Sequence, residues 1–173
     1  MLTHKEENIL NTIDNSLYSF AFNDIIKSRQ QSMLIASFAL CFCFISALSA
    51  HRYFVPGKPK PGEDGQRFRD FILKYFNPKY HIYAKELYSD LRSRLVHNYA
   101  IGERFAFTEG NTINHLKIEE DGTVILLIDD FITDIEIAFT KFRYDLQIDP
   151  ETQPHALDHY YKYNIISARQ EST

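Results

Sequence analysis

Tryptophan is absent from this 173-residue sequence, and cysteine occurs only twice, as Cys41 and Cys43. The two cysteines are two positions apart in an apolar run, so on a helix their side chains point in different directions and cannot easily pair. No further cysteine is present to complete a zinc site. We therefore expect reduced thiols in a hydrophobic core, as in a protein of a reducing compartment such as the cytoplasm.

The motifs of several large enzyme classes are also missing. The six glycines form no glycine-rich phosphate loop, and the sequence has no nucleophile elbow. The first residues, MLTHKEEN, are polar and show no cleavable signal peptide. We therefore expect neither a cofactor nor a resident metal.

The formal net charge is only −4, which argues against a protein that coats nucleic acid. The charge is uneven, because residues 51–105 hold 11 Lys or Arg against 6 Asp or Glu. A basic centre in an otherwise acidic chain fits a small anion-binding site better than a broad basic surface.

Length and composition predict a single domain over residues 1–173, since 45% of the residues are hydrophobic. The longest apolar segment, residues 32–50, is uncharged over 19 positions, which reaches the length of a membrane span. The amphipathic helices expected elsewhere need a central helix to pack against. We therefore interpret this segment as a buried core helix, and a membrane span is the alternative.

Hydrophobic periodicity predicts a mainly α fold, a bundle of about five helices with its core over about residues 5–146. The expected helices cover residues 4–22, 25–52, 66–76, 81–99 and 130–146. Asn23-Asp24 is expected to break the chain between the first two helices. A short helix is also expected near 155–163, inside a polar C-terminal tail that covers 147–173.

Two further segments depart from the helical pattern. Residues 55–65 contain three prolines and three glycines, which predicts a loop. Alternating residues at 104–108 and 115–119, with a turn signal at Asp121-Gly122, predict a small β-hairpin or three-stranded meander inserted over 104–126.

The expected helix 81–99 carries residues that are suited to chemistry. Arg92, His97 and Tyr99 form the pattern Arg-x-x-x-x-His-x-Tyr within LRSRLVHNYA. Histidine transfers protons near neutral pH. Arginine is planar and always charged, so it can stabilise the extra charge on a phosphate in a transition state. Arg92 and His97 thus supply both groups that metal-free RNA cleavage needs, and Tyr99 adds a hydroxyl.

A straight helix would keep these groups apart. Five residues correspond to about 500°, so Arg92 and His97 would point about 140° apart, whereas Tyr99 falls near the face of Arg92. The pair converges only if the helix is irregular or if the side chains fold toward each other. A second chain can also complete the site, and a symmetric dimer is the simplest way to provide one.

A purely structural role is the competing interpretation. In that case Arg92 and Arg94 are solvated helix charges, with Arg94 paired to Asp90 at i, i+4. His97 then interacts with the dipole at the C-terminal end of its helix.

The segment Arg92-Ser-Arg-Leu-Val-His97-Asn-Tyr99 resembles the signature of HEPN domains (higher eukaryotes and prokaryotes nucleotide-binding), an arginine followed after four to six residues by a histidine. Its His-x-Tyr extension is similar to that of HEPN toxins that pair with minimal nucleotidyltransferase antitoxins. The apolar second helix and the segments QRFRDFILKYF and YAKELYSDLRSRLVHNYA also look like bacterial HEPN-like proteins. The resemblance covers roughly residues 5–146.

This resemblance implies a helical bundle that forms a homodimer, with the two motifs facing one cleft. It implies metal-independent RNase activity or RNA and nucleotide binding, in bacterial defence or toxin–antitoxin biology. Arg92 would stabilise the phosphate and the transition state, and His97 would transfer the proton. Tyr99 would be an accessory residue, which an antitoxin partner adenylylates in that toxin group.

Neighbouring polar residues complete the expected site. Ser93, Arg94 and Asn98 are expected to bind phosphate or RNA. HEPN nucleases usually place Asn, Asp or His directly after the arginine, where this chain has Ser93. Two alternatives therefore stay open: a catalytically silent HEPN-like module for nucleotide binding or dimerisation, and a small membrane-anchored protein.

Two other patterns resemble sites but favour structural roles. His155 and His159 are four apart, a spacing that can place two ligands on one metal, but no third ligand is near and a solvated surface is expected. The acidic clusters are expected to serve turns and helix caps rather than a paired-carboxylate site; they comprise Glu119, Glu120, Asp121, Asp129 and Asp130.

Overall fold

The computed structural model describes residues 2–58, 60–110 and 114–165. Most of them are helical, and the label η marks π-helical or 3₁₀ segments. In chain order the elements are α1 (His4–Ser16), η1 (Leu17–Phe22), α2 (Asn23–Gln30), α3 (Leu34–Tyr53), α4 (Glu63–Tyr75), η2 (Pro78–Tyr83), α5 (Ala84–Glu86), η3 (Leu87–Ser93), α6 (Arg94–Asn98), β1 (Phe105–Thr108), β2 (Val124–Leu127), α7 (Ile128–Ile148) and α8 (Thr152–Tyr163). The predicted class, mainly α with a small β insertion, is confirmed.

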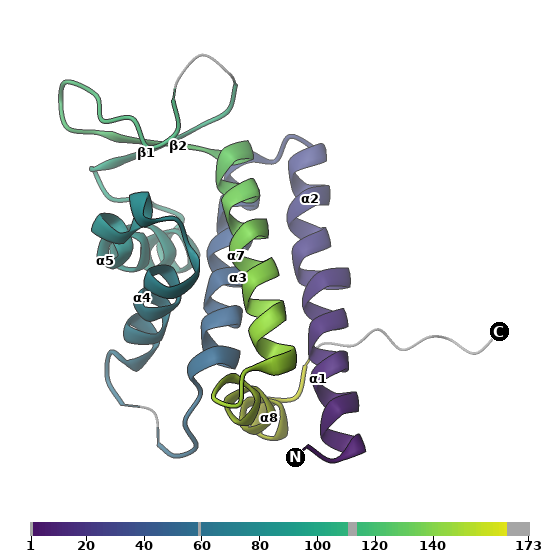
Figure 1. Cartoon of the computed structure of the whole chain (residues 1–173). Helices are drawn as coiled ribbons and strands as arrows, with labels where there is room; N and C mark the ends of the chain where they lie inside the picture. The colour runs from purple at the N-terminus through teal and green to yellow at the C-terminus, as the bar shows by residue number, and fades with distance from the viewer. Residues whose placement is uncertain (1, 59, 111–113, 166–173) are drawn as a thin grey trace.

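Helix α3 lies at the centre of the bundle, and α2, α4, α7 and α8 all pack against it (Figure 1). It is long and apolar enough to cross a membrane, by length and composition alone, and half of that apolar stretch is buried inside the molecule. Phe38, Phe42, Ile45 and Leu48 are fully buried. In this structure α3 is thus the central core helix.

The stripes that predicted the other helices face the core. Tyr83, Leu87, Leu91 and Leu95, at four-residue steps through η2, α5, η3 and α6, are all buried. The apolar residues that repeat at helical spacing in 66–76 and 130–146 are buried as well; they comprise Phe68, Phe71, Ile72 and Phe76, and Phe131, Ile135, Ala138, Phe139 and Phe142. Amphipathic periodicity therefore located these helices correctly.

The expected break at Asn23-Asp24 is wrong. Helices α1 and α2 join through the π-helical segment η1, and the backbone N–H of Asn23 still donates to carbonyls within that segment. Phe22 and Ile25 lie on either side of the expected break, and both side chains are buried in the core. A continuous helix places both of them on its buried face. The chain turns only after Gln30, where Ser32 adopts a left-handed φ of 56°.

Two other boundaries differ from the prediction. The loop predicted over 55–65 ends earlier, because Glu63 and Asp64 begin α4 and acidic side chains favour the first turn of a helix. The short helix predicted near 155–163 is present as α8, and it is not part of a solvated tail. Ala156 and Leu157 are buried where α8 packs on α1, α3 and α7.

The β insertion is not a simple hairpin. Strands β1 and β2 pair in parallel, with Phe105 opposite Val124 and Thr108 opposite Leu127. Among the residues described in this insertion, the antiparallel bridge joins Ile118 and Val124, next to the predicted Asp121-Gly122 turn. The intervening chain therefore doubles back before β2, which brings β2 beside β1 in the same direction.

A buried hydrogen-bond chain ties this insertion to the bundle. Nδ1 of His115 accepts from the backbone N–H of Leu127 at 3.0 Å, so its Nε2 carries the proton of the neutral ring. That Nε2 lies 2.6 Å from the Tyr80 hydroxyl, which donates to the Asp134 carboxylate at 2.7 Å. Lys79 pairs with the same carboxylate at 2.7 Å. These hydrogen bonds thus join η2, the β insertion and α7.

The predicted acidic clusters have mixed roles. Asp121 does serve its turn, because its carboxylate accepts from the backbone N–H of Thr123 at 2.9 Å. Asp129 does not cap α7, contrary to expectation. It accepts two hydrogen bonds from Arg29, at 2.6 and 3.0 Å, while Arg29 also binds Glu109 at 3.0 Å. Arg29 lowers the pKa of Asp129 by these hydrogen bonds.

Candidate functional site

The motif residues lie where the helical chain is irregular. Segment η3 is π-helical, and Arg92 sits in its last turn, while His97 sits in the last turn of the short helix α6. Nη1 of Arg92 lies 3.4 Å from Nε2 of His97. The irregular helix that the sequence required for convergence is therefore present, and the two side chains meet within one chain.

The direction of this contact follows from chemistry. An arginine has only donors, so the Nε2 atom of His97 must accept, through its lone pair. Arg92 is held from a second side, because its Nε donates to the Ser46 hydroxyl of α3 at 3.2 Å. Its guanidinium also lies over the Tyr88 ring, 5.5 Å from the ring centroid. Arg92 is thus positioned by three contacts, one each from α3, η3 and α6.

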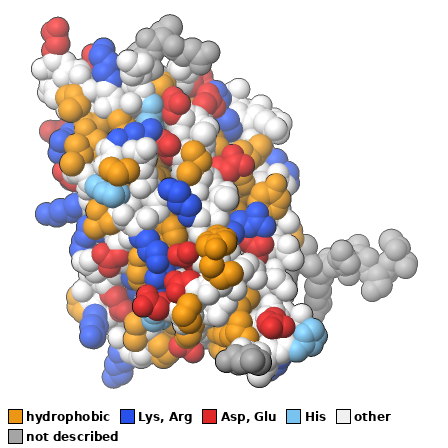
Figure 2. Space-filling view, in the orientation of Figure 1, with side chains coloured by type: hydrophobic (Ala, Val, Ile, Leu, Met, Phe, Trp, Pro, Cys, Tyr) orange, Lys and Arg blue, Asp and Glu red, His pale blue; other side chains and the backbone are white. Residues whose placement is uncertain are grey.

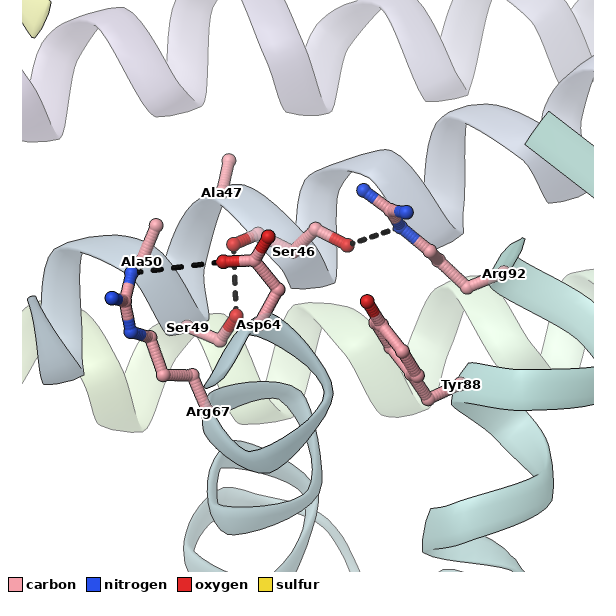
Figure 3. Close-up of a pocket in the computed structure, with 8 residues that line it drawn as sticks. All are labelled: Ser46, Ala47, Ser49, Ala50, Asp64, Arg67, Tyr88 and Arg92. Carbon is pink, nitrogen blue, oxygen red and sulfur yellow. Dashed lines mark hydrogen bonds and ion pairs between the residues drawn. The ribbon is translucent and has the colours of Figure 1, made fainter. Parts of the chain in front are cut away.

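Arg92 lines a pocket of about 250 Å³ between α3, α4 and η3 (Figure 3). Its α3 wall consists of small residues, and its remaining lining is polar or aromatic. Arg67 and Arg92 come from different elements, and Figure 3 shows them at opposite ends of the pocket. The lining residues are Ser46, Ala47, Ser49, Ala50, Asp64, Arg67, Tyr88 and Arg92.

Arg67 is the charged residue of this pocket that the sequence did not single out. It pairs with Glu63 at 2.5 Å and with Asp64 at 3.8 Å, and its Nε is buried without a hydrogen-bond partner in the described structure. Tyr88 approaches α4 closely at Gly65, where a Cβ atom would lie 2.8 Å from its ring. Tyr88 lies one helical turn before Arg92 in the sequence, so it could have been expected beside Arg92, whereas nothing near Arg67 in the sequence relates it to this pocket.

The other predicted site residues are less well assembled. Arg94 is exposed and pairs with Asp90 at 3.9 Å, as the structural interpretation expected. Ser93 is half-buried and Asn98 is exposed. Tyr99 ends α6 in a left-handed conformation, and 77% of it is exposed. In the described residues Arg92 bonds neither Ser93, Asn98 nor Tyr99, so the site assembles around Arg92 and His97 alone.

The surface beside the motif is partly apolar. On α3, Leu40 and Cys43 are exposed, and Val96 is exposed on α6, which packs against α3. Both cysteines are free thiols, but only Cys41 lies in the core, so the expectation of two core thiols is wrong for the exposed Cys43. Burial raises the pKa of the Cys43 thiol, and the nearby Arg92 charge acts in the opposite direction. On the face shown in Figure 2, charges of both signs and hydrophobic side chains are interspersed, so that face carries no broad basic surface.

The histidines of α8 do not lie on a solvated surface as expected. His155 Nδ1 lies 2.5 Å from the Phe54 carbonyl oxygen, and His159 packs its ring 4.3 Å from that of His51, a buried residue of α3. Among the described residues no cluster of three or more His, Cys, Asp or Glu could hold a metal ion.

The geometry around Arg92 and His97 is compatible with binding a phosphate and moving a proton. No protein-family model, no curated protein and no solved structure matches this chain.

Proposed function

We propose that this protein is a HEPN-like, metal-independent endoribonuclease that acts as a homodimer, with Arg92 and His97 as its catalytic residues. One observation carries the proposal: the guanidinium of Arg92 meets Nε2 of His97 at 3.4 Å beside a pocket of about 250 Å³. A general base and a phosphate-binding cation in direct contact are the two groups that the 2′-hydroxyl chemistry of RNA requires.

The contact suggests how substrate starts the reaction. In the free protein Arg92 donates to the lone pair of His97 Nε2. A phosphate of RNA is a stronger acceptor for the guanidinium than a neutral imidazole, because hydrogen bonds between charged groups are stronger. Phosphate binding therefore draws Arg92 away and frees Nε2 to take the proton of the 2′-hydroxyl.

The bonds then change without any further reagent. The 2′-oxygen attacks phosphorus, and the bond from phosphorus to the 5′-oxygen breaks. The products are a 2′,3′-cyclic phosphate and a free 5′-hydroxyl, whose proton comes from a protonated imidazole. In a dimer, His97 of a second copy supplies that proton, which explains why two motifs would face one cleft.

The surface beside the motif favours such a dimer. Leu40 and Cys43 of α3 and Val96 of α6 are exposed around Arg92, and a second copy would cover them. Tyr99 remains accessible to a modifying antitoxin partner. The bacterial cytoplasm and a role in defence or toxin–antitoxin biology are part of this proposal and rest on the resemblance of the motif. The burial of half of the apolar stretch of α3 supports a core helix rather than a membrane anchor.

A silent HEPN-like module that binds RNA or nucleotide is the second candidate. The observation that favours it is Ser93, a half-buried hydroxyl at the position where HEPN nucleases usually carry Asn, Asp or His. A hydroxyl provides one donor, whereas an amide provides two and holds a phosphate more firmly. In this alternative Arg92 still binds phosphate, but His97 transfers no proton.

Cleavage of single-stranded and structured RNA in the presence of EDTA separates the two candidates. We expect wild type to cleave, and His97→Ala and Arg92→Ala to lose activity by about 10²–10⁴-fold. His4→Ala removes an exposed histidine far along the chain and should cleave like wild type. Products ending in 2′,3′-cyclic phosphate identify the mechanism.

Two results would contradict catalysis. Equal cleavage by wild type, His97→Ala and Arg92→Ala would identify a contaminating nuclease. No cleavage by wild type, together with RNA binding that weakens in Arg92→Ala but not in His97→Ala, would establish the silent module instead.

A further inference from the structure

A second pocket, of about 380 Å³, lies apart from Arg92, between η1, α3 and the end of α8. Leu17, Phe20 and Ala21 of η1 line it together with Ala47 of α3 and Ile165, and three further lining residues are polar. A mostly apolar wall with a few polar groups is typical of small-molecule sites, and the volume falls in their range.

Two histidines that no proposed function uses also line this pocket, His51 of α3 and His159 of α8. His51 is only 3% exposed, and the two ring centroids are 4.3 Å apart with the planes at 67°. In the described residues the Nδ1 atom of each ring is buried and has no hydrogen-bond partner. Buried polar atoms are normally satisfied, so two orphaned nitrogens at one pocket call for an explanation.

The chemistry of His51 defines what a partner must provide. Its ring forms a hydrogen bond with the backbone carbonyl of Ala156, and since Nδ1 is the unpartnered atom, Nε2 is the donor. Burial lowers the pKa of His51 to about 3 and also lowers that of His159. At neutral pH the His51 ring is therefore uncharged, and its Nδ1 has a lone pair without a donor. Neither Nδ1 has accessible surface in this structure, so a ring must turn toward the pocket for a ligand to donate to it.

The helix beside the pocket is irregular, which is an independent observation. Segment η1 is π-helical over Leu17–Phe22, and such segments inside long helices are rare and often accompany functional sites. Phe20 recurs at helical spacing with Leu10, Ile13 and Leu17, which are all buried, and this periodicity predicts a core position for it. Instead it is 36% exposed and lines the pocket. The wide turn thus removes a large side chain from the core and places it at the pocket wall.

We propose that this pocket binds a small, neutral, mostly apolar molecule that carries a single hydrogen-bond donor, such as a ring N–H, which it gives to an imidazole Nδ1. An anionic ligand would need a protonated imidazole, and the burial of both rings opposes that. The proposal does not depend on RNase activity, because none of its residues contacts Arg92 or His97 in the described structure.

The test compares two probes of nearly equal size and shape. Indole has a ring N–H, and benzothiophene replaces that N–H with sulfur. Titration of the full-length protein is followed through the imidazole ¹⁵N signals by NMR. We expect indole to bind saturably and to shift the signals of His51 and His159, with at least ten-fold weaker binding of benzothiophene. The signals of the exposed His4 should not move.

Two variants locate the effect. Ala21→Leu fills the pocket and should abolish binding of both probes, while His159→Phe keeps an aromatic ring, removes its nitrogens and should bring the affinity for indole closer to that for benzothiophene. Equal affinity of wild type for the two probes, or no saturable binding of indole, overturns the proposal. Both of these decisive comparisons use wild type, so they do not require that any variant folds.

Discussion

The Tyr80 hydroxyl lies 2.6 Å from Nε2 of His115, and both side chains are buried. The same hydroxyl donates to Asp134, which makes Tyr80 the link between a ring on the β insertion and a carboxylate on α7. Because the His115 side chain is buried, its N–H would be left without a partner if that hydroxyl were lost, whereas Asp134 is half-buried and keeps its pair with Lys79. Removal of the Tyr80 hydroxyl is therefore expected to lower the free energy of unfolding.

Tyr80→Phe should lower the free energy of unfolding by about 1–3 kcal/mol, since it leaves the His115 N–H unpaired and removes one donor to Asp134. Urea unfolding measures this change. Tyr161→Phe is the matched control, because Tyr161 is exposed, and it should stay within about 0.5 kcal/mol of wild type. A Tyr80→Phe protein as stable as that control would show that the chain of hydrogen bonds contributes nothing.

Stability should fall when the pH is lowered from 7 to 5. His51 has a folded pKa of about 3, below its ordinary value of 6.5, so the unfolded chain takes up the proton first as the pH falls. Its contribution is fully present above pH 6.5 and is lost below it, by about 2 kcal/mol at pH 5. His115 and His159, whose pKa values burial also lowers, act in the same direction.

This pH window is specific to the histidines. The carboxylates with lowered pKa, such as Asp129 and Asp149, lose their contributions only below their ordinary range near pH 4. The change in urea midpoint between pH 7, 6 and 5 therefore measures the effect of the buried histidines on stability. A midpoint that stays constant or rises toward pH 5 would contradict the burial of these rings.

Gly102→Ala should destabilise the chain at the end of the motif helix. A Cβ atom at this position would lie 2.6 Å from Cβ of Asp90, whose backbone carbonyl already accepts from the Gly102 N–H at 2.9 Å. Overpacking of this kind costs about 1–3 kcal/mol. Gly65→Ala is the comparison, because its new Cβ meets the ring of Tyr88, a side chain that can rotate, and alanine favours a helix interior. Thermal unfolding in which Gly102→Ala is the more stable of the two would be inconsistent with this close approach.

The two cysteines should differ in reactivity. Cys43 is exposed, whereas Cys41 is fully buried and burial raises its pKa far above the ordinary value. Iodoacetamide at pH 8 should therefore modify Cys43 in the folded protein and Cys41 only after unfolding, as mass spectrometry of peptides can determine.

Arg92→Ala should slow the alkylation of Cys43 a few-fold at the same pH, because the positive charge of Arg92 stabilises the thiolate. This measurement reports the position of Arg92 independently of any activity toward RNA. Lys85→Ala removes an exposed charge elsewhere and should leave the rate unchanged. Equal rates in wild type and Arg92→Ala would place the guanidinium away from α3.

Hydrophobic periodicity was sufficient to locate those helices that bury only one face. The stripe through Tyr83 and Leu95 and the stripe of α7 located their helices, because a 3.6-residue repeat is a local property. The junction at Asn23 was missed since a π-helical segment keeps the helix continuous while it alters the phase, and no local signal marks such a segment. The parallel pairing of β1 with β2 depends on the path of the chain between them, which alternation does not encode.

The candidate site was only partly accessible from the sequence. Arg92 and His97 are five residues apart, so their convergence could be stated as a condition on the helix, and the structure meets it. Ser46 and Arg67 reach the same pocket from positions 46 and 25 residues before Arg92, and nothing local marks them. The same holds for the partners His115 and Asp134, which are 35 and 54 residues from Tyr80.

Both pockets share one residue, Ala47, which α3 presents between them. The first pocket is lined on this side by Ser46, Ala47, Ser49 and Ala50, whose short side chains leave space between the helices, and the second is lined from α3 by Ala47 and His51. Ala47 therefore belongs to the wall of both pockets, and a larger side chain at this one position would take space from each of them.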